Sequence, residues 1–205
     1  MVDAPPKLRS MENEKKPRDS SGGIARLTAI KSLGLGALAA TVGWRLTGAA
    51  EAAGSTQVGW RWCDKCEGMF YAQASAGMGV CPAGGHHSTS GSAHYSATIG
   101  EDVSGRQQGG WRWCHKCEGF FYARASAGMG VCPAGGHHDA TGSGHYAAII
   151  GEDATVGDCS QQGGWRWCHK CEGMFYARAS AGMGVCPAHG THDASGSAHY
   201  AFLYS

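Results

Sequence analysis

Short stretches of alternating hydrophobic and polar residues recur along this chain, and they predict short β-strands. In the second of three similar copies, residues 110–113 alternate so that Trp111 and Trp113 lie on one face of a strand. Residues 120–122 are β-prone and predict the returning strand of a hairpin, and a further strand is expected at residues 145–150. Because these copies contain no sustained run of helix-forming residues, the pattern predicts an all-β unit of three to four short strands.

The copies form a tandem repeat. Each contains the sequence Trp-Arg-Trp-Cys-x-Lys-Cys-Glu-Gly, an aromatic pair, a Gly-Met-Gly-Val-Cys-Pro segment and a late His-Tyr pair, and the first cysteines of the copies are 51 and 54 residues apart. Self-similarity at a fixed period is the signature of a repeat architecture. The repeats span residues 59–100, 110–151 and 164–205, and the Gly-rich linkers at 101–109 and 152–163 are expected to be flexible. The sequence leaves open whether the repeats contact one another.

Each repeat is too small to depend on a hydrophobic core alone. Glycine accounts for 34 of the 205 residues, and the apolar residues of the repeats are mainly aromatic, Ala and Met. Units of about fifty residues are usually stabilised by metal ions or disulfide bonds. The expected fold class is therefore small all-β and metal-stapled, with three tandem modules and little helix apart from the N-terminal segment.

Three cysteines and one histidine recur in every repeat with the spacing Cys-x2-Cys-x14-Cys-x5-His. Three thiolates and one imidazole complete the tetrahedral coordination of a structural zinc ion, and turn amides can stabilise the thiolate charge. We therefore expect three structural Zn²⁺ ions per chain. The expected ligands are Cys63, Cys66, Cys81 and His87; Cys114, Cys117, Cys132 and His138; and Cys168, Cys171, Cys186 and His192.

Two sets of histidines are candidates for the fourth ligand. The favoured set is the second position of the His-His pair, because the first position is Thr191 in the third copy. The alternative set also recurs, each histidine preceding a tyrosine, and its other interpretation is a hydrogen-bonded residue at the start of the last strand. The favoured histidines are His87, His138 and His192, and the alternatives are His94, His145 and His199. Histidines found in only some copies are interpreted as surface residues, namely His115, His169 and His189.

The two cysteine-containing turns of each repeat resemble the metal knuckles of a zinc ribbon. The resemblance rests on the sequences Cys-Asp-Lys-Cys-Glu-Gly and Cys-Pro-Ala-Gly-Gly-His-His, and it covers residues 60–99, 111–150 and 165–204. The second knuckle departs from the pattern, because it has a histidine at five-residue spacing in place of a second Cys-x2-Cys. The repeat also resembles Trp/Cys-rich repeats of uncharacterised secreted bacterial proteins, and this resemblance implies no known activity.

Disulfide bonds and iron are alternatives to zinc. The chain has ten cysteines, an even number, and an exported protein permits disulfide bonds. However, three cysteines per repeat cannot all pair within that repeat, which favours a metal site. Cys159 lies outside the repeated pattern and would be free or bonded between molecules. The sequence does not separate zinc from iron in a thiolate site.

One sequence feature suggests an enzyme. The segment Trp113-Cys114-His115-Lys116-Cys117 is similar to the thioredoxin-type Trp-Cys-x-x-Cys, so a thiol–disulfide oxidoreductase is the alternative function. That motif requires a helix N-terminus to lower the thiolate pKa, and the Glu-Gly pair that follows disfavours a helix here. No other catalytic constellation recurs, and four ligands close the metal site. We therefore expect a non-catalytic protein.

Two tryptophans and the arginine between them form the candidate ligand-binding surface of each repeat. At least one Trp per repeat is expected in the core, and the other could stack on a sugar, a base or a protein groove. These residues are Trp60, Arg61 and Trp62; Trp111, Arg112 and Trp113; and Trp165, Arg166 and Trp167. Residues 55–205 carry a net charge of −2, which argues against nucleic-acid binding. A glycan, cell-wall or protein target is expected, and three copies suit multivalent binding.

The N-terminal segment differs in composition from the repeats. Residues 1–23 are polar and rich in charge, and they predict a disordered basic leader. Residues 24–54 resemble a signal peptide, with a basic start, an uncharged run and a small-residue site that would be cleaved after Ala52. An amphipathic helix is the alternative, and the uncharged run is short of the about 20 apolar residues that a membrane span needs. The sequence therefore predicts a secreted or periplasmic protein.

Overall fold

The computed structural model describes residues 55–205, apart from residues 76, 102–104, 126–127, 157–158 and 180–181. The expected basic leader and signal-like segment lie outside the described residues, as does the expected cleavage site after Ala52. The described part of the chain consists of strands and loops without a helix, which confirms the all-β prediction. In these residues, no segment forms an apolar helix of membrane-spanning length.

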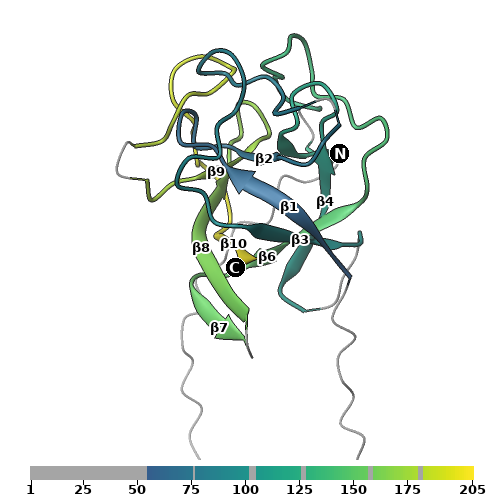
Figure 1. Cartoon of the computed structure of the whole chain (residues 1–205), viewed down its shortest axis with the longest axis vertical. Helices are drawn as coiled ribbons and strands as arrows, with labels where there is room; N and C mark the ends of the chain where they lie inside the picture. Colours follow the sequence, from purple (N-terminus) through teal and green to yellow (C-terminus); the bar gives the residue numbers. More distant parts are fainter. Residues whose placement is uncertain (1–54, 76, 102–104, 126–127, 157–158, 180–181) are drawn as a thin grey trace, which may run out of the picture. The chain divides into compact units, whose positions relative to one another are not determined.

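Each repeat folds into one long and two shorter strands (Figure 1). The strands of the first repeat are β1 (Thr56–Trp62), β2 (Met69–Tyr71) and β3 (Tyr95–Ile99). Those of the second are β4 (Gln107–Trp113), β5 (Phe120–Tyr122) and β6 (Tyr146–Ile150). Those of the third are β8 (Cys159–Trp167), β9 (Met174–Tyr176) and β10 (Tyr200–Tyr204). The hairpin and the late strand predicted from residues 120–122 and 145–150 are therefore both present.

The long strand of each repeat pairs antiparallel with both short strands of the same repeat. In the first repeat, Trp62 of β1 lies opposite Met69 of β2, and Thr56 lies opposite Thr98 of β3. A β-bulge between Val58 and Trp60 shifts the register of β1 against β3, and β4 and β8 have a corresponding irregularity. Because the long strand bridges its two partners, the cysteine turn after β1 is held at the end where β2 begins.

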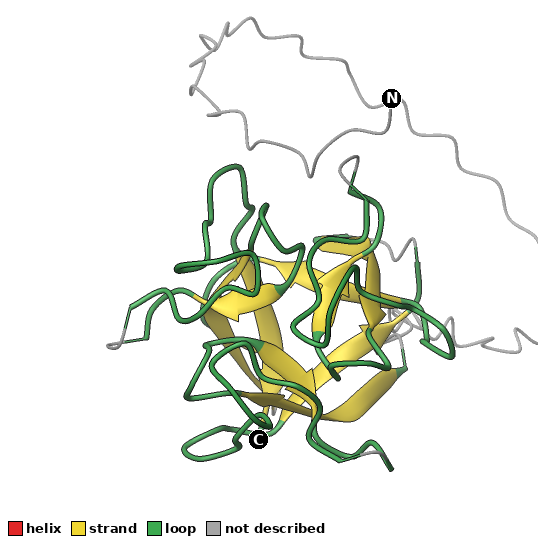
Figure 2. Ribbon diagram, turned by 90° about the horizontal axis from the view of Figure 1, so that it is seen from above, coloured by secondary structure: helices red, strands yellow, loops and turns green. Residues whose placement is uncertain are grey.

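The three repeats join into one ten-stranded sheet with approximate threefold repetition. The last strands close a triangle, because β3 pairs with β6, β6 with β10, and β10 with β3. The short strands β2, β5 and β9 form a second set of contacts, with single bridges from each repeat to another. Seen from above, the strands surround a common centre and the loops lie outside them in three groups (Figure 2).

Aromatic side chains from all three repeats fill one shared core. Each first tryptophan packs edge-on against the late tyrosine of the next repeat, with ring centroids 5.4 Å apart for Trp60 and Tyr146. The same contact follows in order around the ring, at 5.3 Å for Trp111 and Tyr200 and 5.1 Å for Trp165 and Tyr95. Edge-to-face contact at this distance adds stabilisation beyond area burial. No repeat therefore completes its core alone, which answers the question that the sequence left open.

The linkers contribute strand residues, contrary to the expectation that they are flexible. Residues 107–109 belong to β4, and residues 159–163 belong to β8. The second linker also contains the strand β7 (Ala154–Val156), which pairs with β8 as an additional hairpin. Composition alone was misleading here, because Gln and Gly residues enter a sheet when a neighbouring strand satisfies their backbone groups.

Candidate metal centres

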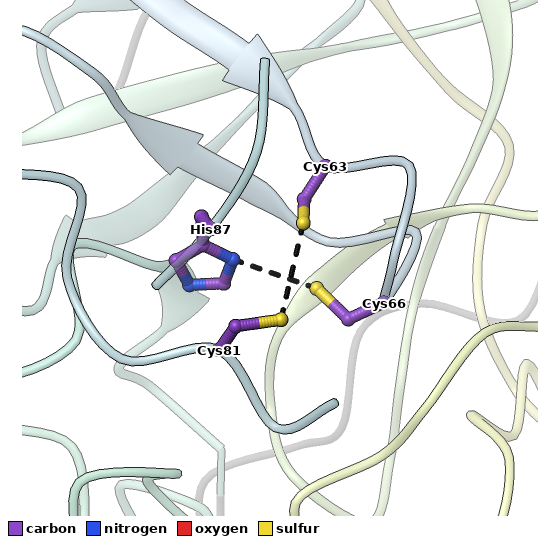
Figure 3. A group of neighbouring side chains, drawn as sticks. All are labelled: Cys63, Cys66, Cys81 and His87. Atoms are coloured by element: carbon purple, nitrogen blue, oxygen red, sulfur yellow. Dashed lines mark hydrogen bonds between the residues drawn. The ribbon is translucent and has the colours of Figure 1, made fainter. Parts of the chain in front are cut away.

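Three buried clusters, each of three cysteines and one histidine, lie in the loops at one end of the sheet. In each cluster the four potential ligand atoms lie within 4.8 Å of one another. Figure 3 shows the first cluster, in which the sulfur atoms and the imidazole ring point toward a common centre. The members are Cys63, Cys66, Cys81 and His87; Cys114, Cys117, Cys132 and His138; and Cys168, Cys171, Cys186 and His192. These are the twelve residues predicted from the spacing.

One sulfur–sulfur and one sulfur–nitrogen distance in each cluster match those of a tetrahedral metal ion. The Sγ atoms of Cys63 and Cys81 are 3.9 Å apart, and Cys66 Sγ lies 3.5 Å from His87 Nδ1. The corresponding distances are identical in the other two clusters. A tetrahedral ion with metal–sulfur bonds of about 2.3 Å and metal–nitrogen bonds of about 2.0–2.1 Å places two sulfurs about 3.8 Å apart and sulfur and nitrogen about 3.5–3.6 Å apart. The three sites are therefore consistent with three bound metal ions.

The protonation of the clusters also suits a cation. Hydrogen bonds from Cys66 and Cys81 hold the pKa of the Cys63 thiol far below its usual range. The same contact with Cys63, together with burial, raises the pKa of Cys66. Burial lowers the pKa of His87, but hydrogen bonds to Cys63 and Cys81 outweigh it and raise the pKa to about 9. A divalent ion would displace the protons that these groups otherwise share.

Contacts around each cluster fix the positions of the ligands. The backbone N–H of Ser88 donates to Cys63 Sγ at 3.4 Å, and the equivalent N–H groups of Asp139 and Asp193 donate to Cys114 and Cys168. These amides stabilise thiolate charge, as expected from the turn sequences. Phe70 stacks on the imidazole of His87 with ring centroids 4.6 Å apart, and the other two repeats have the same stack. Each histidine is therefore held in one orientation toward its sulfurs.

The glutamate after each Cys-x2-Cys pair adopts a left-handed backbone, with φ of 64° for Glu67 and Glu118 and 63° for Glu172. This conformation is uncommon for a residue with a side chain, so the surroundings must hold it. The buried carboxylate accepts a hydrogen bond from the second tryptophan of the repeat, at 2.7 Å between Trp62 Nε1 and Glu67 Oε2. Burial raises the pKa of all three carboxyls, to about 7 for Glu172. The indole N–H opposes that shift.

The same glutamates connect neighbouring repeats. The carbonyl oxygen of Glu118 accepts a hydrogen bond from Tyr71 N–H in the first repeat at 2.9 Å. Glu172 accepts from Tyr122, and Glu67 accepts from Tyr176, so the contacts close a ring. We call the turn that contains the first two cysteines of each repeat the metal turn (residues 63–68, 114–119 and 168–173). The metal turn of every repeat is thus hydrogen-bonded to the preceding repeat.

A second ring of contacts involves the glycine-rich loop before the third cysteine. A Cβ on Gly79 would lie 2.2 Å from the carbonyl oxygen of Cys117, and Gly130 and Gly184 approach Cys171 and Cys66 in the same way. In the second repeat, His138 Nε2 also lies 3.2 Å from the Cys171 carbonyl oxygen. With Nδ1 facing the sulfurs, Nε2 carries the proton and donates to that oxygen. A metal ligand of one repeat therefore contacts the metal turn of the next.

The remaining histidines lie outside the clusters. His94, His145 and His199 are exposed, and each directly precedes the last strand of its repeat. They bind Arg61, Glu101 and Glu152 respectively. The alternative fourth ligands are therefore the hydrogen-bonded residues that their position also suggested. The histidines interpreted as surface residues are indeed exposed, namely His115, His169 and His189.

The candidate ligand-binding surface is only partly available. Trp60, Trp111 and Trp165 are fully buried in the shared core, so they cannot stack on a ligand. Their expected role in ligand binding is therefore excluded by burial, although a core position for one Trp per repeat is confirmed. Of the second tryptophans, Trp62 and Trp113 are half-buried and Trp167 is 6% exposed.

The arginines between the tryptophans are engaged within the protein. Arg61, Arg112 and Arg166 each donate to the backbone carbonyl of the preceding tryptophan. Arg112 also forms an ion pair with Glu101, and Arg166 forms one with Glu152, at 3.6 Å between Nη2 and Oε1. These contacts hold the guanidinium groups against the strands, so the arginines stabilise the fold at these positions.

The cysteines of the repeats are not joined in disulfide bonds. All nine are free and buried, and the 3.9 Å separation of Cys63 and Cys81 sulfurs exceeds the roughly 2.05 Å of an S–S bond. The Cys-x2-Cys turn leads into a short strand and not into a helix, unlike the thioredoxin-type motif. The side chain of Cys159 lies outside the described residues, although its backbone begins β8.

Sequence reasoning missed the residues that support the ligands. The Phe–His stacks and the Trp–Glu hydrogen bonds have a recoverable signal, because each pair recurs at fixed spacing in all three repeats. The contacts between repeats have no such signal. Comparison of the chain with family models, curated proteins and solved structures finds no match, so the assignment of the site depends on its geometry and chemistry.

Proposed function

We propose that this protein is a non-catalytic, secreted binding protein whose fold is held by three structural zinc ions. The observation that carries the proposal is the threefold occurrence of a closed, buried Cys3His cluster with tetrahedral spacing. Four protein ligands fill the coordination of zinc and leave no open position for a substrate, which is characteristic of structural sites. Zinc is favoured over iron because three thiolates with one imidazole is a common structural zinc set.

The threefold arrangement supports binding to a repetitive glycan, cell-wall or protein target. The repeats share one sheet and one core, so equivalent surfaces are held at fixed mutual positions. A rigid array gains affinity when the spacing of the target matches its own, because the second and third contacts become intramolecular. This differs from flexibly linked modules, which adapt to many spacings with a larger entropic cost.

Metal analysis of the purified full chain tests the structural role of zinc. We expect three zinc ions per chain in the wild-type protein, and fewer in Cys114→Ser, because serine cannot replace a thiolate ligand. Cys159→Ser is the matched control, since Cys159 lies outside the repeated motif, and it should retain three ions. Stoichiometric iron with visible thiolate-to-metal absorption would contradict zinc, and wild-type protein without metal would contradict the proposal altogether.

A further inference from the structure

The structure contains clefts between neighbouring repeats that none of the metal chemistry uses. A cleft of about 570 Å³ lies between the first and second repeats, where Tyr71 and Gln57 face Trp113. The equivalent cleft between the third and first repeats has a volume of about 440 Å³. Both lie within the roughly 300–1,000 Å³ of small-molecule binding sites. We refer to the first as the Trp113 cleft and to the second as the Trp62 cleft.

The indole ring in the Trp113 cleft is rigidly placed and partly uncovered. Its Nε1 donates to Glu118 Oε2 at 2.6 Å, and its backbone N–H donates to Ser143 Oγ at 2.8 Å. Gly142 also lines the cleft, and a Cβ at this position would stand 4.0 Å from Trp113 Cζ3. Because glycine has no side chain, the ring remains available on this side. The Trp62 cleft has the same design, since Gly91 lines it and a Cβ at that position would stand 3.7 Å from Trp62 Cζ3.

Polar side chains lie across the cleft from the indole, and they keep hydrogen-bonding groups available for a ligand. Tyr146 Oη donates to Gln57 Oε1, which fixes the amide of Gln57. Within the part of the chain that the structure describes, Gln57 Nε2 and Tyr71 Oη have no protein hydrogen-bond partner. The cleft therefore offers an amide donor and a hydroxyl opposite an aromatic surface.

The lining of the Trp113 cleft contains no Lys or Arg. Its one carboxylate, that of Glu118, is buried and accepts the indole N–H of Trp113. A nucleotide would bring a phosphate without a cation to meet it, whereas a pyranose combines an apolar face with neutral hydroxyl groups. We propose that the Trp113 cleft binds a neutral oligosaccharide, with one sugar ring against Trp113 and its hydroxyls hydrogen-bonded to Gln57 and Tyr71. This assignment rests on the proposed binding function and specifies its site and ligand class.

The two clefts differ at their rims, so we expect them to differ in sugar preference. The Trp62 cleft contains Asp64 and Arg178 where the Trp113 cleft contains His115 and Gln73. Charged groups at the rim favour substituted or charged sugars, whereas the neutral rim favours unsubstituted ones. The Trp113 cleft is therefore the one to test with neutral ligands.

The test is a titration of the zinc-loaded full chain with cellotetraose, maltotetraose and chitotetraose, followed by NMR of the indole N–H signals. The Trp113 signal is identified by its loss in Trp113→Phe. At least one tetrasaccharide should shift this signal in a saturable manner. Gly142→Asn should weaken that binding by at least about tenfold, because its side chain would cover the ring. Asn tolerates the φ of +76° at this position.

Gly196→Asn is the matched control. Gly196 is the equivalent residue of the third repeat, has a φ of +77° and would place its Cβ within 4 Å of no other atom. This variant should retain the affinity of the wild-type protein, and both variants should retain three metal ions. If no tetrasaccharide binds to protein that holds three metal ions, the sugar assignment fails while the zinc scaffold stands. If binding occurs but Gly142→Asn leaves it unchanged, the site lies elsewhere and the inference is overturned.

Discussion

The metal clusters and the clefts between repeats arise from the same threefold sequence, yet they differ in how closely the three copies agree. The clusters have the same four residue types and the same sulfur–sulfur and sulfur–nitrogen distances in every repeat. The cleft rims vary, with Asp64, His115 and His169 at one equivalent position. The exposure of the second tryptophan varies as well.

This difference follows from the chemistry of the two regions. A tetrahedral ion requires four donors at fixed distances, so a changed ligand removes the site. The rim of a binding cleft has no such requirement. Each polar residue there contributes separately to ligand binding, and a water molecule can replace a direct hydrogen bond that is lost. The threefold repeat thus combines metal clusters that are the same in every copy with cleft surfaces whose residues can differ between copies.

Removal of the metal should have the largest effect and should affect all three repeats at once. The metal turns are joined in a ring, since each donates or accepts backbone hydrogen bonds with its neighbours. Binding free energy at structural zinc sites is folding free energy, and at about 10–16 kcal/mol per site it is as large as the total stability of about 5–15 kcal/mol typical of a domain. A strong chelator should therefore release the three ions and abolish the near-UV circular dichroism signal in a single transition.

Independent modules would behave differently. They would lose their ions one at a time, and a protein with two ions would retain about two-thirds of its near-UV signal. Simultaneous recording of metal release with a chromogenic indicator and of the dichroism signal distinguishes the two cases. Stepwise release, or a folded metal-free protein, would contradict coupling through the ring.

A single methyl group between repeats should have the next largest effect. In Gly130→Ala the new Cβ would lie 2.2 Å from the carbonyl oxygen of Cys171, in the metal turn of the third repeat. The backbone is also left-handed, with φ of +65°. Strain of this backbone costs about 1 kcal/mol and the clash adds about 1–3 kcal/mol, so we expect a total loss of about 2–4 kcal/mol in unfolding free energy.

The same change at Gly136 isolates the contribution of the contact. Gly136 has φ of +66°, almost equal to that of Gly130, but a Cβ there would meet no atom within 4 Å. Gly136→Ala should therefore lose only the backbone strain, about 1 kcal/mol. Urea denaturation of both variants with zinc present measures the difference. Equal losses would show that the close approach between repeats contributes nothing to stability.

The sequence predicted the metal clusters more completely than the fold around them, for a physical reason. The ligands recur at short, fixed spacing, and the chemistry of one ion restricts their identity, so His87 could be distinguished from His86 by comparing the three copies. His94 recurs as well, and only the structure separates it from the ligands. The ring of contacts between the three repeats could not be predicted, because these contacts join residues that lie far apart in the sequence. Tyr146 and Gln57, for example, are separated by 89 positions. Nothing in one repeat indicates that its tryptophan packs on the tyrosine of another.

Local composition also predicted the linkers incorrectly and the tryptophans only in part. Gln107 and Gln161 were predicted to be linker residues, yet their backbones pair with neighbouring strands. The alternation in residues 60–62 predicted that both tryptophans lie on one face of the strand. Contacts with the neighbouring repeats determine that Trp60 is fully buried whereas Trp62 is only half-buried. The burial of a side chain between repeats depends on how the three repeats pack together, and the residue pattern of one repeat carries no information about that packing.

The variable outer surface should have the smallest effect, and Glu101 is a direct test. Its carboxylate lies against Arg112, Arg124 and His145 of the second repeat, and Arg124 Nη2 donates to it at 2.6 Å. Burial alone would raise the pKa of Glu101, but the hydrogen bonds from His145 and Arg112 lower it below its ordinary value. The pairs are partly exposed, so Glu101→Gln should lose only about 0.5–1 kcal/mol of unfolding free energy.

The pH dependence of that loss follows from the direction of the pKa shift. A lowered pKa in the folded state gives stabilisation that is fully present above the unfolded-state pKa of about 4.3 and is lost as the pH falls through the folded-state value. At pH 8, where the zinc ligands remain bound, Glu101 is ionised and its contribution should be fully present in the difference between Glu101→Gln and wild type. It should shrink in about 1 M salt, where the Debye length is about 3 Å. A loss above about 2 kcal/mol, or one insensitive to salt, would show that the outer surface holds the repeats together as firmly as the metal end does.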